Sequence, residues 1–554
     1  MAGLRGSNRR CQNRSLNLGF RGRIVGGCVA CRDGWVITEI PVYQAPQRFG
    51  LRQCTLGQLQ EGALTWVQLG STNSFLGYAF PPSSIPLETP PFMSSSPNFL
   101  AMDANVTAET TTQSSEQTQS SEQSQLSEQT SGVDRRGFLK ASAGAGVAAG
   151  VATSFFNRSV HAQGSDIIKV GLVGAGGRGT GAAKDAMDAD SGCRLTAIAE
   201  ITDDRLDGAK KNLKRTLGEQ FAVPDDQCFS GLDSMQKLLE TDINVVLLTT
   251  PPGFRPMQME AAVAAGKHIF CEKPVAVDPV GVRRVMAASE AAKEKGLSLV
   301  SGLCWRYDLG VKATMEKIHS GAIGDIISVQ ENYLAGTLWI REPKDFWTPM
   351  HNQVMNWLYY RWLSGDHIVE QFIHSLDKSM WLHHDVPPVL AYGMGGRQVR
   401  TDVEYGDIYD HFYVVYEWAD GTRTYAATRQ MPNCFNETED YVFGTKGTAR
   451  VLANEITGEN PWKFSGQKPS MYYLEHVALM KSIREGKPLN NGDYMCKSTL
   501  MAIMGREAAY SGEVIRWDDI KDSKMSLMPE KLQWGEAPAV EVHQPGSYSF
   551  NKTL

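Results

Sequence analysis

The sequence predicts an α/β protein whose first folded domain is a doubly wound parallel sheet. Short apolar strands end in glycine or proline turns, and helical segments separate one strand from the next. One of these turns is a glycine-rich loop that opens a helix. Residues 163–554, about 390 in number, are enough for two domains with sizeable cores. We therefore expect a second domain after the parallel sheet.

The first expected strand is the β-branched apolar run IIKVGLV at 167–173. It leads directly into GAGGRG, a G-x-G-x-x-G pattern. The first glycine permits a tight turn, the second lets the backbone approach a pyrophosphate, and the third lets the helix pack against the strand. The amides at the start of that helix would then meet the phosphate charge. The loop residues expected to bind a dinucleotide are Gly174, Gly176, Gly177, Arg178 and Gly179.

A second strand, RLTAIAE, ends in Glu200, which lies 21 residues after Gly179. An acid at this spacing can accept hydrogen bonds from the adenosine ribose and would repel a 2'-phosphate. The pattern therefore favours NAD over NADP. Arg178 and Arg205 are the nearby groups that could reverse this preference, and the alternative is that Glu200 simply ends a strand in solvent.

Two further strands should border the same crevice, because the carboxyl ends of parallel strands meet at one edge of the sheet. The run INVVLLTT at 243–250 is followed by two prolines, and the expected helix at 256–265 is followed by GKHIFCEKP. The residues that we expect at the cofactor from these two strands are Thr250, Pro251, Glu272 and Lys273.

With these motifs, residues 166 to about 520 resemble the glucose-fructose oxidoreductase, inositol dehydrogenase and rhizopine-catabolism (Gfo/Idh/MocA) family, with AGKHIFCEKP as the most specific part. The resemblance implies an N-terminal Rossmann NAD(P)-binding domain at 166–304. It also implies a C-terminal α/β domain at 305–515 with a large, mainly antiparallel open sheet. Association through that sheet would give a homodimer or homotetramer.

The segment SGDHIVEQFIHSLDKSMWL carries the expected chemistry. On one helix, Asp366, Glu370, His374 and Asp377 would share an arc of about 80°. The corresponding helix of the family carries Asp-x-x-x-His-x-x-Asp, so Glu370 departs from the usual aspartate. Two other interpretations stay open: a metal site using Asp366, Glu370 and His374, which lacks a complete ligand motif, and a structural core histidine.

The resemblance implies reversible hydride transfer between a sugar, polyol or related carbinol and a nicotinamide cofactor, without a metal. His374 would be the general base, because its reference pKa near 6.5 suits proton transfer. Lys273 would hydrogen-bond the reacting oxygen, and Glu370 or Asp366 would orient the imidazole. We expect Arg306 to contact the cofactor. The candidate substrate contacts are Tyr307, Trp339, Trp357 and Asp377.

The chain before residue 163 has three expected parts. Residues 1–101 contain nine arginines and no lysine, which is typical of translated GC-rich upstream DNA and predicts a non-native or disordered extension with the true start at Met102 or Met93. Residues 102–132 are a Ser/Gln/Glu-rich disordered linker. Residues 133–162, with Arg135 and Arg136 before an apolar stretch, are similar to a twin-arginine signal cleaved near Gln163.

That signal predicts export by the twin-arginine machinery to the periplasm or cell envelope. Because this route carries folded proteins, we expect a tightly bound cofactor, NAD with NADP as the alternative. Residues 516–554 are expected to be a polar tail that wraps the surface.

Composition excludes several classes of protein. A net charge of -6 and a pI near 6.1 indicate no nucleic-acid partner, and the sequence has no apolar stretch of the roughly 18 to 20 residues that a membrane-spanning helix needs. Ten cysteines in 554 residues do not indicate a disulfide scaffold. Two other functions remain: an NAD-dependent glycosidase that oxidises, eliminates, hydrates and reduces, and a non-catalytic sugar-binding protein.

Overall fold

The structure is a computed structural model that describes residues 30–31, 34–35 and 167–553. It divides into two units, Met1–Ala145 and Gly146–Leu554. In the first unit, β1 (Ala30–Cys31) and β2 (Gly34–Trp35) form an antiparallel pair. The expected linker and twin-arginine signal lie outside the described residues, as does nearly all of the expected N-terminal extension.

The first domain of the second unit is built on a six-stranded sheet with the order β5-β4-β3-β6-β7-β8, and every strand pair in it is parallel. Its strands are β3 (Ile168–Val173), β4 (Cys193–Glu200), β5 (Cys228–Ser230), β6 (Val245–Leu248), β7 (His268–Cys271) and β8 (Leu299–Ser301). The strand order reverses beside β3, which leaves a crevice at the carboxyl ends of β3 and β6. The predicted doubly wound fold is confirmed.

Helices cover both faces of this sheet. The helices are α1 (Gly177–Ala189), α2 (Asp203–Leu217), α3 (Ser234–Leu239), α4 (Arg255–Ala264) and α5 (Pro279–Glu294). Neighbouring residues of a strand point to opposite faces. Val246 and Leu248 therefore pack with α3, α4 and α5, whereas Val245 and Leu247 pack with α1 and α2. Burial on both faces explains why these strands read as continuous apolar runs.

The second domain is built on a nine-stranded sheet with the order β16-β15-β14-β13-β9-β12-β11-β10-β17. Its strands are β9 (Ile326–Ala335), β10 (Leu390–Gly396), β11 (His411–Glu417), β12 (Arg423–Gln430), β13 (Glu437–Gly444), β14 (Gly447–Arg450), β15 (Glu455–Gly458), β16 (Trp462–Lys463) and β17 (Ile515–Arg516). Neighbours run antiparallel except β9 and β12, which pair in parallel. The large, mainly antiparallel sheet is thus also confirmed.

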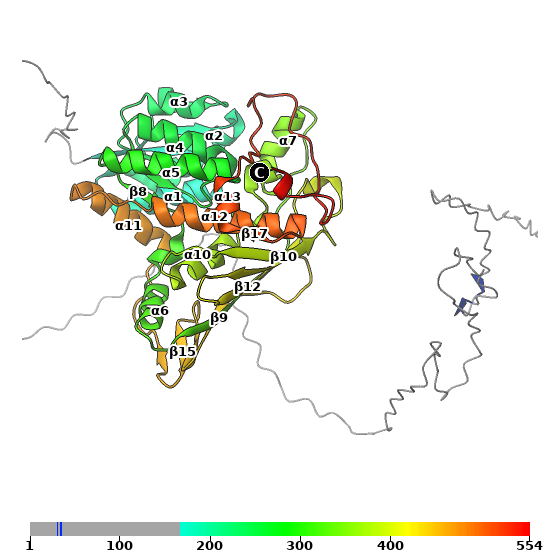
Figure 1. The fold of residues 1–554 in the computed structure, drawn as a ribbon. Coiled ribbons are helices and arrows are strands. Elements are labelled where there is room, and N and C mark those ends of the chain that lie inside the picture. The colour runs from blue at the N-terminus through cyan, green and yellow to red at the C-terminus, as the bar shows by residue number, and fades with distance from the viewer. Residues whose placement is uncertain (1–29, 32–33, 36–166, 554) are drawn as a thin grey trace, which may run out of the picture. The chain divides into compact units, whose positions relative to one another are not determined.

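The long helix α12 (Gly492–Ser511) joins the two domains. It contacts α5 of the first domain and β10 and β11 of the second, and nearly all of its residues are buried. Figure 1 shows it between the helices of the parallel sheet and the strands of the second sheet. Three further helices of residues 305–553 are α6 (Leu309–His319), α11 (Met471–Arg484) and α13 (Trp517–Asp522). In residues 167–553, the structure contains no helix that is both long and apolar enough to cross a bilayer.

The predicted single helix through Asp366, Glu370 and His374 is wrong. The structure divides this segment into α9 (His367–Glu370) and α10 (Ile373–Leu382). Gly365 and Asp366 both have positive φ, and the Asp366 carboxylate accepts the His367 N–H as an N-cap. The chain therefore turns at Gly365 and Asp366, and α9 begins only after Asp366. For this reason Asp366 does not share a helix face with His374.

Two segments lie over the mouth of the crevice. The first, residues 336–365, contains α7 (Pro349–Met355), the short 3-10 helix η5 (Trp357–Tyr359) and α8 (Arg361–Ser364). The second, residues 523–550, is called the C-terminal strap here, and Figure 1 shows it in red beside α7. Trp534 of the strap stacks on His351 with 3.8 Å between ring centroids, and the Leu527 amide donates to Asp278 at 2.7 Å.

Candidate active site

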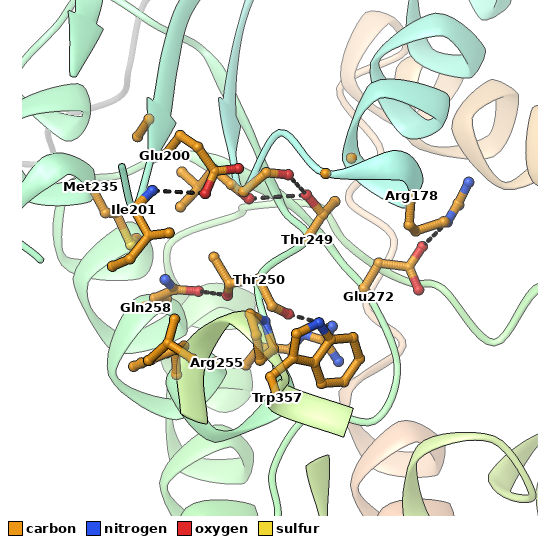
Figure 2. Close-up of a pocket in the computed structure, with 18 of the residues that line it drawn as sticks. Arg178, Glu200, Ile201, Met235, Thr249, Thr250, Arg255, Gln258, Glu272 and Trp357 are labelled. Atoms are coloured by element: carbon orange, nitrogen blue, oxygen red, sulfur yellow. Dashed lines mark hydrogen bonds and ion pairs between the residues drawn. The ribbon is translucent and has the colours of Figure 1, made fainter. Parts of the chain in front are cut away.

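One cavity of about 570 Å³ lies at the carboxyl ends of the parallel strands and extends under the second domain (Figure 2). The sequence-predicted residues that line it are Gly174, Gly176, Gly177, Arg178, Gly179, Glu200, Thr250, Pro251, Glu272, Lys273, Trp339, Trp357, Glu370 and His374. They come from both domains and both sides of the crevice. The fold thus brings the expected dinucleotide-binding groups and the expected chemical groups into a single space.

Two positions of the glycine-rich loop can accept only glycine, one because of its backbone angle and the other because of close packing. Gly174 has φ of +87°, and a Cβ at Gly179 would lie 1.9 Å from the Gly174 carbonyl oxygen. Helix α1 starts within this loop at Gly177, so its first amides lack partners inside the helix. Close backbone packing and free amides are what a bound pyrophosphate requires. The loop therefore fits a dinucleotide.

Glu200 is held firmly at the end of β4. Its Oε2 accepts the Ala175 amide at 2.8 Å, its Oε1 accepts the Ile201 amide at 2.7 Å, and Arg205 Nε lies 3.3 Å from Oε1. Each carboxylate oxygen has further lone pairs that a ribose hydroxyl can use. Glu200 is thus in place as a ribose acceptor, with the Arg205 cation directly beside it.

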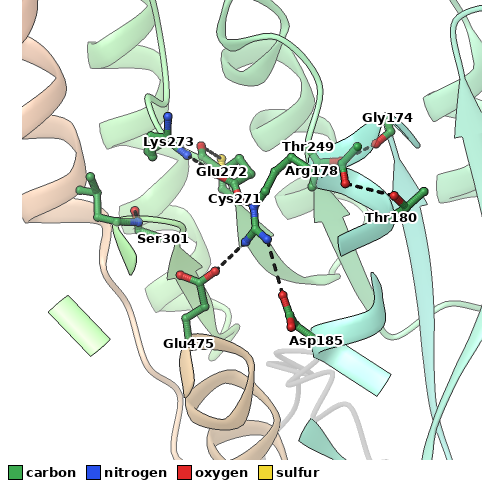
Figure 3. Close-up of polar contacts among 12 residues, drawn as sticks. Gly174, Arg178, Thr180, Asp185, Thr249, Cys271, Glu272, Lys273, Ser301 and Glu475 are labelled. Atoms are coloured by element: carbon green, nitrogen blue, oxygen red, sulfur yellow. Dashed lines mark hydrogen bonds and ion pairs between the residues drawn. The ribbon is translucent and has the colours of Figure 1, made fainter. Parts of the chain in front are cut away.

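Arg178 is turned away from that end of the cavity. Its guanidinium pairs with Glu272, with Glu475 at 2.8 Å and with Asp185 at 3.6 Å (Figure 3). The ring of Tyr472 lies 4.6 Å from the guanidinium carbon. Arg178 therefore connects the glycine-rich loop to the turn after β7 and to α11, and its charge is satisfied there. Of the two arginines that could have favoured NADP, only Arg205 lies next to Glu200.

Glu475 was not predicted from the sequence. It is fully buried, and burial followed by the nearby Glu272 carboxylate raises its pKa well above the ordinary value. Tyr472, one turn earlier on α11, lines the cavity. Both lie about 300 residues from Arg178 along the chain, and neither belongs to a motif. Only the folded arrangement identifies them.

Arg255 is a second site residue that the sequence did not predict. It is buried and lines the cavity. Its guanidinium donates to the Thr250 carbonyl at 2.6 Å, drawn in Figure 2, and to the Pro274 carbonyl. It thereby connects the loop after β6 to the loop after β7, which carries Lys273.

Lys273, Glu370 and His374 form the chemical end of the cavity. The Lys273 ammonium donates to the Glu370 carbonyl at 2.7 Å and lies 3.1 Å from Glu370 Oε1. His374 Nδ1 is buried and has no hydrogen-bond partner within residues 167–553. Burial, then the charges of Lys273, Lys378 and Arg178, hold the pKa of His374 well below its ordinary value. The imidazole is therefore neutral near pH 7 and able to accept a proton.

Asp366 does not reach this group of residues. It is fully buried outside the cavity lining, where its carboxylate accepts the Tyr409 amide at 2.8 Å and the Tyr510 hydroxyl at 2.5 Å. The expectation that Asp366 orients the His374 imidazole is wrong, because its oxygens are used elsewhere. Glu370 pairs with Lys273 instead, so neither carboxylate holds the imidazole.

Arg306, Tyr307 and Asp377 also lie outside the cavity, contrary to the prediction that they contact cofactor or substrate. Arg306 pairs with Asp377 at 2.9 Å and with Asp385 at 2.6 Å, and the Tyr307 hydroxyl donates to Asn491 at 2.7 Å. These side chains fasten the start of the second domain. Among the described residues, no group of three or more His, Cys, Asp or Glu side chains is arranged to hold a metal ion.

Comparison with known proteins finds relatives of the first domain. Residues 168–302 match the model of the GFO_IDH_MocA family, described as an oxidoreductase family with an NAD-binding Rossmann fold. The chain is 29% identical over 240 residues to an inositol 2-dehydrogenase of Gluconacetobacter diazotrophicus, covering 42% of this chain and 66% of that protein. It is 25% identical over 253 residues to a 2,7-anhydro-N-acetylneuraminate hydratase of Escherichia coli, covering 45% of this chain and 61% of that protein.

Solved structures share the fold of both domains. The aldose-aldose oxidoreductase of Caulobacter crescentus superposes with a TM-score of 0.50 at 20% identity, covering 63% of this chain and 99% of that one. A levoglucosan dehydrogenase solved with NADH and levoglucosan also gives 0.50, at 18% identity and the same coverage. Residues 168–302 of the chain are thus similar to the NAD-binding Rossmann domain of the Gfo/Idh/MocA oxidoreductases.

Proposed function

We propose that this protein is an NAD-dependent oxidoreductase that transfers hydride between a nicotinamide cofactor and a carbinol of a sugar, polyol or related compound. The observation that carries the proposal is the single cavity, which holds the glycine-rich loop and Glu200 at one end and Lys273, Glu370 and His374 at the other. The inositol 2-dehydrogenase relative supports a polyol-like substrate.

The cavity residues divide the work of the reaction. When bound, the nicotinamide supplies the hydride acceptor. His374 accepts the hydroxyl proton, because its imidazole is neutral near pH 7. Lys273 donates a hydrogen bond to the same oxygen and favours its alkoxide character. Glu370 holds the Lys273 ammonium in place, and Trp357 is a candidate surface for the sugar ring.

The cofactor is held tightly in this proposal. Trp339, Arg341 and Trp357 of the second domain and Leu532 of the C-terminal strap all line the cavity. The strap is fastened by the Gly535 amide, which donates to the Thr348 hydroxyl at 3.3 Å. A cofactor bound in the loop would have to leave past these side chains. NAD is preferred because Glu200 lies where a 2'-phosphate would be repelled, with NADP as the alternative through Arg205.

We infer export to the periplasm or cell envelope through the twin-arginine machinery from the paired Arg135 and Arg136. A tightly held cofactor suits that route, because the protein would bind NAD while folding in the cytoplasm. All six cysteines of residues 167–553 are free thiols, and four of them are buried. Such thiols fit a chain that folds before it meets an oxidising compartment.

We also infer a homodimer or homotetramer. The face of the nine-stranded sheet that points away from α12 carries exposed apolar side chains, among them Tyr392, Met394 and Tyr413. Because these lie side by side on β10 and β11, they form a contiguous patch of the kind that protein interfaces use.

A second candidate function is the NAD-dependent glycosidase, in which the same hydride transfer is transient and water adds before the final reduction. The hydratase relative favours this function. The Lys273–Glu370 pair favours it as well, because it offers an acid and a base in addition to His374. Elimination next to a carbonyl needs a base and an acid in addition to the group that serves the oxidation step.

The deciding experiment uses the full-length protein. It is denatured, the released nucleotide is identified by mass spectrometry, and the native protein is then tested on polyols, free sugars and glycosides. About one NAD per chain with net reduction by a polyol supports the oxidoreductase. Glycoside cleavage without net reduction supports the glycosidase. A protein that releases no nucleotide and binds no added NAD or NADP refutes both and leaves the non-catalytic interpretation.

A further inference from the structure

Three ionisable side chains are buried together behind the site, on the inner face of the nine-stranded sheet. Lys378 lies on α10, Glu331 on β9 and Asp440 on β13, and all three are almost completely excluded from solvent. Glu331 and Asp440 are direct partners in the register of β9 and β13. None of the three lines the cavity. We call them the α10 base cluster.

Lys378 connects this cluster to the candidate general base. Its ammonium lies 3.0 Å from Asp440 Oδ2 and donates to the His374 carbonyl at 2.6 Å. The ring of Trp305 lies 5.3 Å from the same ammonium. Since His374 precedes Lys378 by one helical turn, the ammonium sits against the turn that carries the imidazole.

Lys378 and Asp440 form the ion pair of the cluster. Burial and the adjacent Asp440 raise the pKa of the third member, Glu331, to about 8, so that carboxyl is mostly protonated near pH 7. A buried ion pair of this kind contributes little stability, because the cost of removing both charges from water offsets their attraction. Its position one turn from the candidate base therefore needs another explanation.

We propose that Lys378 is a positioning residue for His374: it holds the first turn of α10 through the His374 carbonyl, and Asp440 holds the Lys378 ammonium there. The Lys378 ammonium also places a positive charge near the imidazole, which helps to lower the pKa of His374. The proposal rests on the proposed function, in which His374 is the general base.

The other charges around His374 are already engaged. Lys273, in the loop after β7, pairs with Glu370 of α9. Arg178 of α1 pairs with Glu272 and Glu475. These cations and Lys378 are the charges that lower the pKa of His374, after burial. Lys378 differs from the others because it lies outside the cavity, so it can be replaced without removing a group that touches cofactor or substrate.

The test compares wild type with Lys378→Met and with the double variant Lys378→Met/Asp440→Asn in the full-length protein. The double variant also removes the Asp440 carboxylate that Lys378→Met would leave buried without its partner, so it keeps the experiment decisive if the single variant does not fold. Histidine is labelled with ¹⁵N, and the imidazole is followed by NMR as the pH is lowered from 8 until the His374 signal has titrated. That signal is assigned by its loss in His374→Asn.

We expect the His374 midpoint to rise in both Lys378 variants, because removing a nearby positive charge favours the protonated imidazole. With a substrate found in the screen above, kcat should fall about tenfold through misplacement of the base, and its acid limb should move to higher pH. Lys497→Met is the matched control, since it removes a lysine paired with Asp493 on α12 and should change neither quantity.

An unchanged His374 midpoint in a double variant that folds and retains its nucleotide would falsify the proposal. If neither Lys378 variant folds, the cluster has a purely structural role, and this result would also refute the proposal. Failure of the proposed function has a separate signature: wild type would oxidise no carbinol and cleave no glycoside, while the NMR titration would still report on Lys378.

Discussion

The charge state of His374 and the position of Lys273 depend on their surroundings as much as on their residue types. His374 is neutral because it is buried beside cations, and Lys273 is fixed because Glu370 offers it both a carbonyl and a carboxylate. Neither property follows from residue type alone, because both depend on which side chains the two domains bring together. Two predictions concern single residues of this cavity.

Replacing His374 with Asn removes the proton acceptor and keeps a side chain of similar size. We expect turnover to fall by roughly 10² to 10⁴, the usual contribution of a general base. Bound NAD should remain at the wild-type level, because the glycine-rich loop and Glu200 are untouched. Steady-state rates and nucleotide content measure the two effects. His411→Asn is the control, since His411 pairs with Asp410 away from the cavity, and equal losses in both variants would refute the role of His374.

Replacing Glu200 with Ala should weaken NAD binding and relax discrimination against NADP. The change removes a negative charge from the adenosine end and leaves Arg205 beside Gly176 without its carboxylate partner. Titration of the nucleotide-free protein with NAD and with NADP measures the ratio of the two dissociation constants. Glu219→Ala, an exposed acid of the same domain, should leave that ratio unchanged. A constant ratio in Glu200→Ala would mean that the carboxylate only holds the Ala175 and Ile201 amides.

At the scale of elements, those with a local signal were predicted well. The first strand was expected at 167–173 and is found at Ile168–Val173, and the helix expected at 256–265 is Arg255–Ala264. The segment around Asp366 failed because its helical spacing was interrupted by an N-cap whose oxygens accept from Tyr409 and Tyr510, far away in sequence. Distant partners of this kind decide where a helix breaks.

The C-terminal strap is the element for which we expect a measurable effect on the cofactor. Trp534→Ala removes the stack on His351 and should loosen Leu532 over the cavity, so NAD should leave faster. The rate is measured by the loss of bound nucleotide during dilution and filtration. Val540→Ala is the control, because Val540 is half-exposed in the same strap. An unchanged release rate in Trp534→Ala would mean that the strap does not retain the cofactor.

At the scale of the whole molecule, the open face of the nine-stranded sheet determines the expected assembly. Met394→Asp places a charge in the apolar patch of β10 and β11, where the Met394 side chain is 67% exposed. Burying that charge in an interface would be costly, so the assembly should dissociate. Sedimentation velocity measures the mass. Val403→Asp, at a 90% exposed site in the short 3-10 helix Val403–Tyr405, should keep the wild-type mass. A wild type that sediments as a monomer would contradict the proposed oligomer outright.

By itself, the sequence determined the features whose physics is local. Three features act within one turn or one strand, so their spacing is readable along the chain. They are the three motif glycines of the turn, the acid at the end of the next strand and the apolar runs buried on both faces. Only the tertiary structure decided which oppositely charged side chains, distant from each other in sequence, form ion pairs. Glu475 reaches Arg178 across 297 positions, Glu370 reaches Lys273 across 97, and Asp440 meets Lys378 under the turn that holds His374. Coulomb attraction and burial depend on separation in space, which sequence separation does not report.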